Sequence, residues 1–110
     1  MNIQVFHKKN GIVLTLMGIL TNHSAGQTFI DRVRKETLPD TRYIVLNFNE
    51  SSLPDSRFIG KLIELYHEYK RSGIKMYLLG SKNEDITDLF KVAYLDRLMP
   101  FIKSEDDIVA

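Results

Sequence analysis

The chain has 110 residues, the size of one domain, and 44% of them are hydrophobic. Charged residues make up 26%, and the formal net charge is +1. Bulk charge therefore gives no indication of a nucleic-acid partner or a membrane surface. The absence of cysteine excludes a disulfide framework and a thiolate metal site. We expect a single domain over residues 1–110, with no cofactor.

The N-terminal residues lack the charged-then-apolar order of a secretory signal peptide. The longest apolar stretch, about residues 12–20, is interrupted by Thr15 and Gly18. It falls far short of the ~20 residues that cross a bilayer. We therefore expect a cytoplasmic protein without membrane insertion.

The first predicted elements are two strands. Residues 3–7 are a candidate first arm of a hairpin, and residues 12–17 read as a largely buried second strand. Between them, Asn10 and Gly11 form the pair that favours a tight turn.

A helix is predicted next. Thr21 or Asn22 is the expected cap, because its side-chain oxygen can accept from a free N–H of the first turn. Pro39 and Asp40 are expected to close the helix. Its apolar positions recur at helical spacing at Ala25, Phe29, Ile30 and Val33.

Residues 43–48 form the clearest predicted strand, and their almost continuous apolar character is typical of a strand covered on both faces. A polar loop over residues 49–54 leads to a second amphipathic helix, from about residue 56 to residue 71. Gly73 is expected to end this helix.

Residues 74–79 predict another strand, and acceptors at residues 83–85 predict the start of a third helix. Residues 95–102 are expected to be a connection, with a short strand near 100–102. A last short helix is expected from Ser104. Strands thus alternate with helices from residue 12 onward, which favours an α/β fold with parallel strand pairs.

Catalytic motifs are missing from the sequence. His7, His23 and His67 are far apart, without acidic or histidine neighbours at metal-ligand spacing. The glycines are dispersed, so no phosphate-binding loop is formed, and no Gly-x-Ser-x-Gly elbow is present. The chain therefore reads as a binding module rather than an enzyme.

The segment from the strand at 43–48 to Gly73 contains the run Asp55, Ser56, Arg57, Phe58, Ile59 and Gly60. This run resembles the Asp-Ser-Ser/Thr-Gly-Leu-Gly motif of the STAS domain, the fold of bacterial anti-sigma-factor antagonists and of sulfate-transporter tails. Residues 18–21, 73–80, 88–101 and 104–107 resemble further segments of that family in the same order. The resemblance implies a STAS-like mixed sheet of four to five strands with about four helices.

In that family, the serine of the motif is phosphorylated by an anti-sigma factor with a kinase fold, and the unphosphorylated antagonist binds that kinase and frees the sigma factor. The resemblance therefore implies partner switching that regulates transcription. The partners would be an anti-sigma factor or related serine kinase and a possible phosphatase. Ser56 is the candidate phosphorylation site. The candidate partner-binding residues are Thr21, Asn22, Asn49, Asp55, Ser56, Arg57, Phe58 and Ile59.

Simpler interpretations stand beside these. Ser56 is also a candidate for plain helix N-capping. Arg57 is either a solvated charge or a partner for a phosphate on Ser56, and Phe58 is either an extension of the apolar stripe or a contact residue. Thr21 and Asn47 stand where the family usually has aspartates. These departures favour a second hypothesis, a phosphorylation-independent STAS scaffold in a signalling or transport complex. A small-molecule or nucleotide sensor, or an enzyme of the same fold, is the third.

Overall fold

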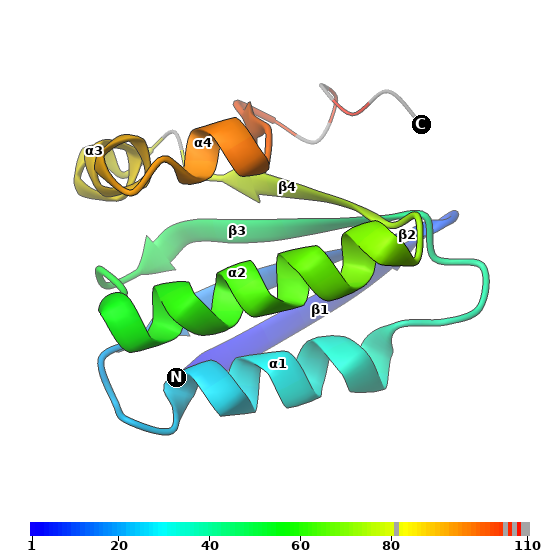
Figure 1. Cartoon of the computed structure of the whole chain (residues 1–110), viewed down its shortest axis with the longest axis horizontal. Coiled ribbons are helices and arrows are strands. Elements are labelled where there is room, and N and C mark those ends of the chain that lie inside the picture. Colours follow the sequence, from blue (N-terminus) through cyan, green and yellow to red (C-terminus); the bar gives the residue numbers. More distant parts are fainter. Residues whose placement is uncertain (81, 105, 107, 109–110) are drawn as a thin grey trace.

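Figure 1 shows a computed structural model of the chain, which describes residues 1–80, 82–104, 106 and 108. Within these residues, five strands form one sheet in the order β1-β2-β3-β4-β5, accompanied by four helices. The predicted α/β architecture is therefore confirmed. The elements are β1 (Asn2–Lys8), β2 (Gly11–Gly18), α1 (Ala25–Glu36), β3 (Tyr43–Ser51), α2 (Ser56–Arg71), β4 (Lys75–Leu79), α3 (Glu84–Val92), α4 (Leu95–Leu98) and β5 (Phe101–Ile102).

The sheet is mixed because only its first pair is antiparallel. β1 and β2 form the predicted hairpin, with Lys8 opposite Gly11. Asn10 in the turn has a φ of 63°, a left-handed conformation that asparagine tolerates. The pairs β2–β3, β3–β4 and β4–β5 are parallel. The carboxyl ends of β2, β3 and β4 therefore lie at one edge of the sheet.

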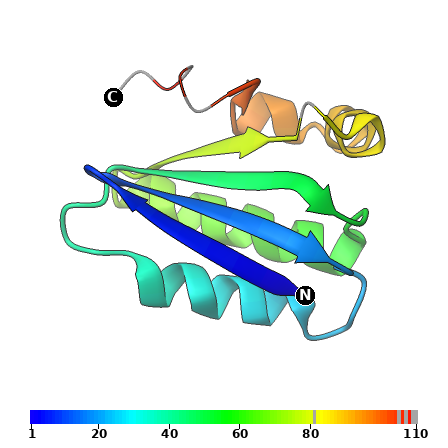
Figure 2. The same cartoon turned by 180° about the vertical axis from the view of Figure 1, so that it is seen from behind.

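Helices α1 and α2 pack on one face of the sheet (Figure 1). Seen from behind in Figure 2, the opposite face of β1, β2 and β3 carries no helix of the described chain. The prediction that the strand at 43–48 is covered on both faces is confirmed, because Ile44, Val45, Leu46 and Phe48 are all buried. On the open face the cover consists of side chains rather than a helix, since a second apolar cluster surrounds Val45. That cluster also contains Val13, Tyr77, Leu79 and Ile102.

The start of α1 differs from the prediction. The helix begins at Ala25 after Ser24, so neither Thr21 nor Asn22 is its N-cap. Instead, Oδ1 of Asn22 accepts from both the backbone N–H and the hydroxyl of Ser24, at 2.8 Å each. Asn22 thus forms a turn that precedes the helix rather than capping it. The helix also ends earlier than expected, with Thr37 as its C-cap.

The C-terminal elements match the sequence in part. Asn83 is the N-cap of α3, with its side chain accepting from the N–H of Ile86. The short strand near 100–102 is confirmed as β5, whereas α4 lies in a segment predicted to be only a connection. Most of the helix expected from Ser104 falls on residues outside those described.

Candidate functional site

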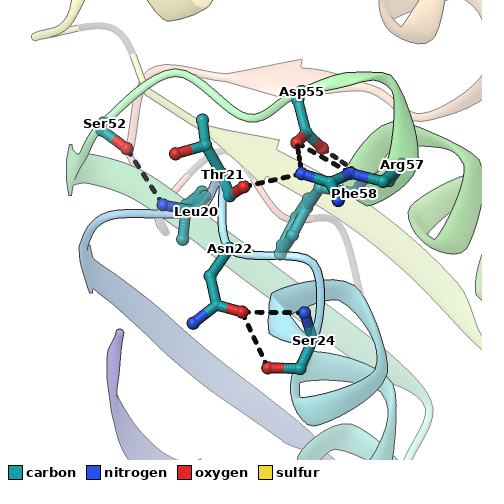
Figure 3. A network of polar contacts seen from close by, with 8 residues as sticks. All are labelled: Leu20, Thr21, Asn22, Ser24, Ser52, Asp55, Arg57 and Phe58. Atoms are coloured by element: carbon teal, nitrogen blue, oxygen red, sulfur yellow. Dashed lines mark hydrogen bonds and ion pairs between the residues drawn. The ribbon is translucent and has the colours of Figure 1, made fainter.

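Three loops meet at the carboxyl edge of the parallel strands. The loops after β2 and β3 are joined by Ser52, whose N–H donates to the carbonyl of Gly18 at 2.8 Å. Its Oγ accepts from the N–H of Leu20 at 3.0 Å (Figure 3). The loop after β4 is joined to the last residues of β3, where the N–H of Lys82 donates to Oδ1 of Asn49 at 3.0 Å. The loops after β2 and β3 carry Thr21, Asn22 and Asp55 of the predicted site, so this edge is the candidate site.

Asp55 caps helix α2 at this edge. Its backbone is extended, and its Oδ1 accepts from the N–H of Phe58 at 3.0 Å. This hydrogen bond first, and the hydrogen bond from Arg57 second, lower the pKa of the Asp55 carboxyl below its ordinary value. Because Asp55 occupies the cap position, the interpretation of Ser56 as the N-cap is wrong.

The guanidinium of Arg57 joins α2 to the loop after β2. It donates to Oδ2 of Asp55 through Nη2 at 2.8 Å and Nε at 3.2 Å, and Nη2 also donates to the carbonyl of Thr21 at 2.8 Å (Figure 3). Arg57 is therefore an exposed but partnered charge. An exposed pair of this kind contributes about 0–1 kcal/mol, so its main effect is to hold two loops in one arrangement.

Ser56 is the first residue of α2, and it is exposed to solvent. Within the described part of the chain, its hydroxyl has no hydrogen-bond partner. The backbone N–H groups of the first turn and the positive end of the helix dipole lie beside it. The position is chemically suited to accept a phosphate, because both features stabilise an anion at a helix start.

Phe58 does not belong to the exposed surface. It is only 1% exposed, and its ring lies between those of Phe29, at a centroid distance of 5.1 Å, and Phe48, at 6.3 Å. The prediction of Phe58 as a partner-binding residue is therefore wrong, because the ring completes the core under α1 and α2. Ile59 is half-buried and packs against the same core.

The other predicted contact residues differ in what they present to solvent. Thr21 and Asn22 are exposed in the loop after β2. Asn49 is half-buried, and it is engaged through its N–H with Oδ1 of Asn47 as well as through its own Oδ1 with Lys82. The fold thus brings Thr21 and Asn22 to the same surface as Asp55, Ser56 and Arg57, whereas Asn49 supports the loops from within.

Two exposed apolar residues at this edge did not figure among the predicted site residues. Ile19 is 65% exposed in the loop after β2, and Leu53 is 43% exposed in the loop after β3. Leu53 had a sequence signal, an apolar residue among polar turn formers, whereas Ile19 directly follows the apolar strand and had none. We define the loop surface as Ile19, Thr21, Asn22, Leu53, Asp55, Ser56 and Arg57.

Metal and membrane features give no further indication of function. Among the described residues, no group of three His, Cys, Asp or Glu side chains is placed to hold a metal ion. None of the helices in the described segments is long and apolar enough to cross a membrane.

Comparison with known proteins identifies the family. The family model of the STAS domain matches residues 2–108. A domain with this match and this sheet is a STAS domain, and the chain belongs to the STAS domain family. No curated protein matches the sequence.

Solved structures of anti-sigma factor antagonists share the fold. The unphosphorylated form of the anti-sigma factor antagonist SpoIIAA aligns with a TM-score of 0.76 and 20% identity, covering 99% of this chain and 100% of its own. A putative anti-sigma factor antagonist from Thermotoga maritima aligns at 0.82 and 19% identity, covering 96% and 89%. The phosphorylated form of SpoIIAA, a Bacillus cell fate determinant, aligns at 0.69 and 20% identity, covering 96% and 95%. At these identities, the likeness establishes the fold alone.

Proposed function

We propose that this chain is an anti-sigma-factor antagonist-like protein that regulates transcription by partner switching in the cytoplasm. In this proposal the loop surface binds an anti-sigma factor or related serine kinase, and phosphorylation of Ser56 controls the binding. A phosphatase would restore the unmodified state. The chain acts by binding and is not itself an enzyme. The observation that carries the proposal is Ser56 at the start of α2 in a STAS domain, exposed and without a side-chain hydrogen bond to any described residue.

Electrostatics supports Ser56 as a switch. The two charged side chains of the loop surface, Asp55 and Arg57, already form an ion pair with each other. A phosphate adds about −1.5 to −2 charges at neutral pH. One modification would therefore change a nearly neutral surface into an anionic one, and an acidic partner surface would then be repelled.

The apolar side chains of the loop surface support partner binding. Ile19 and Leu53 lie on the two loops that Ser52 joins, and both are exposed. Exposed apolar groups beside a polar network are typical of protein interfaces. A partner that covers Ile19 and Leu53 would therefore also contact the start of α2.

Incubation with a kinase-type anti-sigma factor and ATP, read by intact mass, tests the modification. We expect one added phosphate on the wild-type chain and on Ser72→Ala, which alters an exposed serine at the opposite end of the same helix. Ser56→Ala should remain unmodified. A phosphate on Ser56→Ala, or none on the wild type, would contradict the proposal.

A phosphorylation-independent scaffold is the second candidate, because Arg57 already bonds to Asp55 and Thr21 where the family has a small Ser or Thr. In that case Ser56→Asp would leave partner binding unchanged. Since Phe58 is buried, Phe58→Ala is unsuitable as a test of the contact surface. Ile19→Ser and Leu53→Ser are the appropriate variants, and both candidates predict that they weaken binding. Only the switch predicts that Ser56→Asp weakens binding too.

A further inference from the structure

A second concave surface lies at the amino ends of β3 and β4, the edge of the sheet opposite to Ser56. It encloses about 300 Å³, a volume at the lower end of small-ligand pockets. Residues from the hairpin turn, the starts of both strands and the C-terminal segment line it. They include Asn10, Arg42, Tyr43, Lys75, Tyr77 and Ile108.

The hollow contains two cations and no lining carboxylate from the described residues. Neither Arg42 nor Lys75 has a carboxylate oxygen within 4.0 Å in the described chain. Among the described residues, the guanidinium of Arg42 donates only to the carbonyls of Pro39 and Thr41, each at the long distance of 3.4 Å. Two cations that have no carboxylate partner among the described residues, on one concave surface, favour the binding of an anion.

The walls of the hollow are aromatic and held in place. The ring of Tyr43 lies directly over Gly11 of β2, since a Cβ on Gly11 would be 2.0 Å from Cζ of Tyr43. Glycine at this position therefore permits the ring to lie flat against the sheet. Tyr77 is 7% exposed and belongs to the apolar cluster on the open face of the sheet. A pair of fixed tyrosine rings offers contact area at little conformational cost.

The rim beside Arg42 is tied to the hairpin. The carbonyl of Asn10 accepts from the N–H groups of Arg42 at 2.7 Å and Tyr43 at 3.3 Å. The backbone that carries the cation and the ring is thus fixed before any ligand arrives. Preorganisation of this kind lowers the cost of binding.

We propose that this hollow binds a small anion with a compact aromatic body. Its carboxylate or phosphate group lies against Arg42 and Lys75, and its body lies between Tyr43 and Ile108. The site is separate from the loop surface, so it does not depend on whether Ser56 is phosphorylated.

Amide chemical shifts of the full chain, followed by NMR during titration, test the site. The probes are phenyl phosphate, benzoate, inorganic phosphate and benzyl alcohol. We expect saturable shifts at Gly73, Lys75 and Tyr77 with phenyl phosphate or benzoate, and at least fivefold weaker binding of phosphate and benzyl alcohol, which each lack one half of the ligand. The stronger of the first two probes identifies the anionic group.

Substitutions locate the binding. Lys75→Gln and Arg42→Gln should each weaken the binding of the better probe by about fivefold or more, since each removes a charge-assisted contact. Lys91→Gln, an exposed lysine on α3, should have no effect, and unshifted resonances elsewhere show that each variant is folded. The proposal is overturned if no probe gives saturable shifts, if inorganic phosphate binds as well as phenyl phosphate and benzoate, or if Lys91→Gln weakens binding as much as Lys75→Gln.

Discussion

The carboxylate of Asp55 accepts a hydrogen bond from the backbone N–H of Phe58 at 3.0 Å, so Asp55 rather than Ser56 caps helix α2. Because Asp55 already caps the first turn by accepting from one of its free N–H groups, the hydroxyl of the neighbouring Ser56 is not needed as a cap. Ser56 can therefore change its chemical state while the helix keeps its cap.

Substitution of the cap tests this separation. Asp55→Ala should lower the free energy of unfolding by about 1 kcal/mol, the usual cost of losing an N-cap. Ser56→Ala should change it by less than about 0.5 kcal/mol, as expected of an exposed residue without a partner. Urea denaturation measures both. If Ser56→Ala costs as much as Asp55→Ala, the assignment of the cap is wrong.

The stability of the fold at low pH should depend on the same carboxylate of Asp55. Hydrogen bonds lower the folded-state pKa of Asp55 through Phe58 and Arg57, and that of Glu68 through Arg34. A lowered pKa contributes stability above the unfolded-state pKa of about 4, and this contribution is lost as the pH falls through the folded-state value. The urea concentration at the unfolding midpoint should therefore decrease when the pH is lowered below about 4. This decrease should be smaller in Asp55→Asn than in the wild type. An equal decrease in both would contradict the role of Asp55.

Phe58→Ala should destabilise the fold strongly. Its ring is packed between Phe29 and Phe48, so truncation leaves a cavity in the core. The expected loss is about 3–5 kcal/mol in the free energy of unfolding, and Phe58→Leu should lose less. Ile19→Ala is the matched surface control, with an expected change below about 0.5 kcal/mol. A loss at Phe58 no larger than at Ile19 would place Phe58 on the surface after all.

Tyr94 occupies a position that glycine would fill at lower cost. Its φ is 59°, in the left-handed region, and its side chain is 60% exposed beneath the guanidinium of Arg97. Tyr94→Gly should raise the free energy of unfolding by about 0.5–1 kcal/mol, since the strain removed exceeds the exposed ring contact. Tyr94→Ala keeps the left-handed strain and should give no gain. Thermal denaturation compares the two variants. Destabilisation by Tyr94→Gly would contradict the strained left-handed backbone at Tyr94.

Periodicity predicted the elements with long apolar patterns. Helix α2 has the predicted bounds, and β3 and β4 differ from prediction only at their ends. The apolar sequence of β3 correctly predicted burial on both of its faces, although not what buries each face. Val45 is buried by side chains of neighbouring strands rather than by a helix, and a strand's own sequence does not distinguish these two surroundings.

The site was predictable in its location but less so in its contacts. Ser56 was placed correctly at the start of α2, because an amphipathic helix following a turn-rich loop has few possible starts. The cap was misassigned because Asp55 and Ser56 are adjacent and both favour that position. The contacts of Arg57 with Thr21 span 36 residues, and local sequence patterns carry no signal for such a pair. Likewise, the position of Phe58 in the sequence is compatible with a core residue and with an exposed contact residue. Only the packing of α2 on the sheet decides between the two.

The affinity of a kinase-type anti-sigma factor for the unmodified and the Ser56-phosphorylated chain tests the central claim most directly. Isothermal titration calorimetry at one salt concentration provides the comparison. Partner switching predicts that phosphorylation weakens binding at least about tenfold, which corresponds to about 1.4 kcal/mol. Equal affinity of the two forms would contradict the switch and leave the loop surface as that of a scaffold.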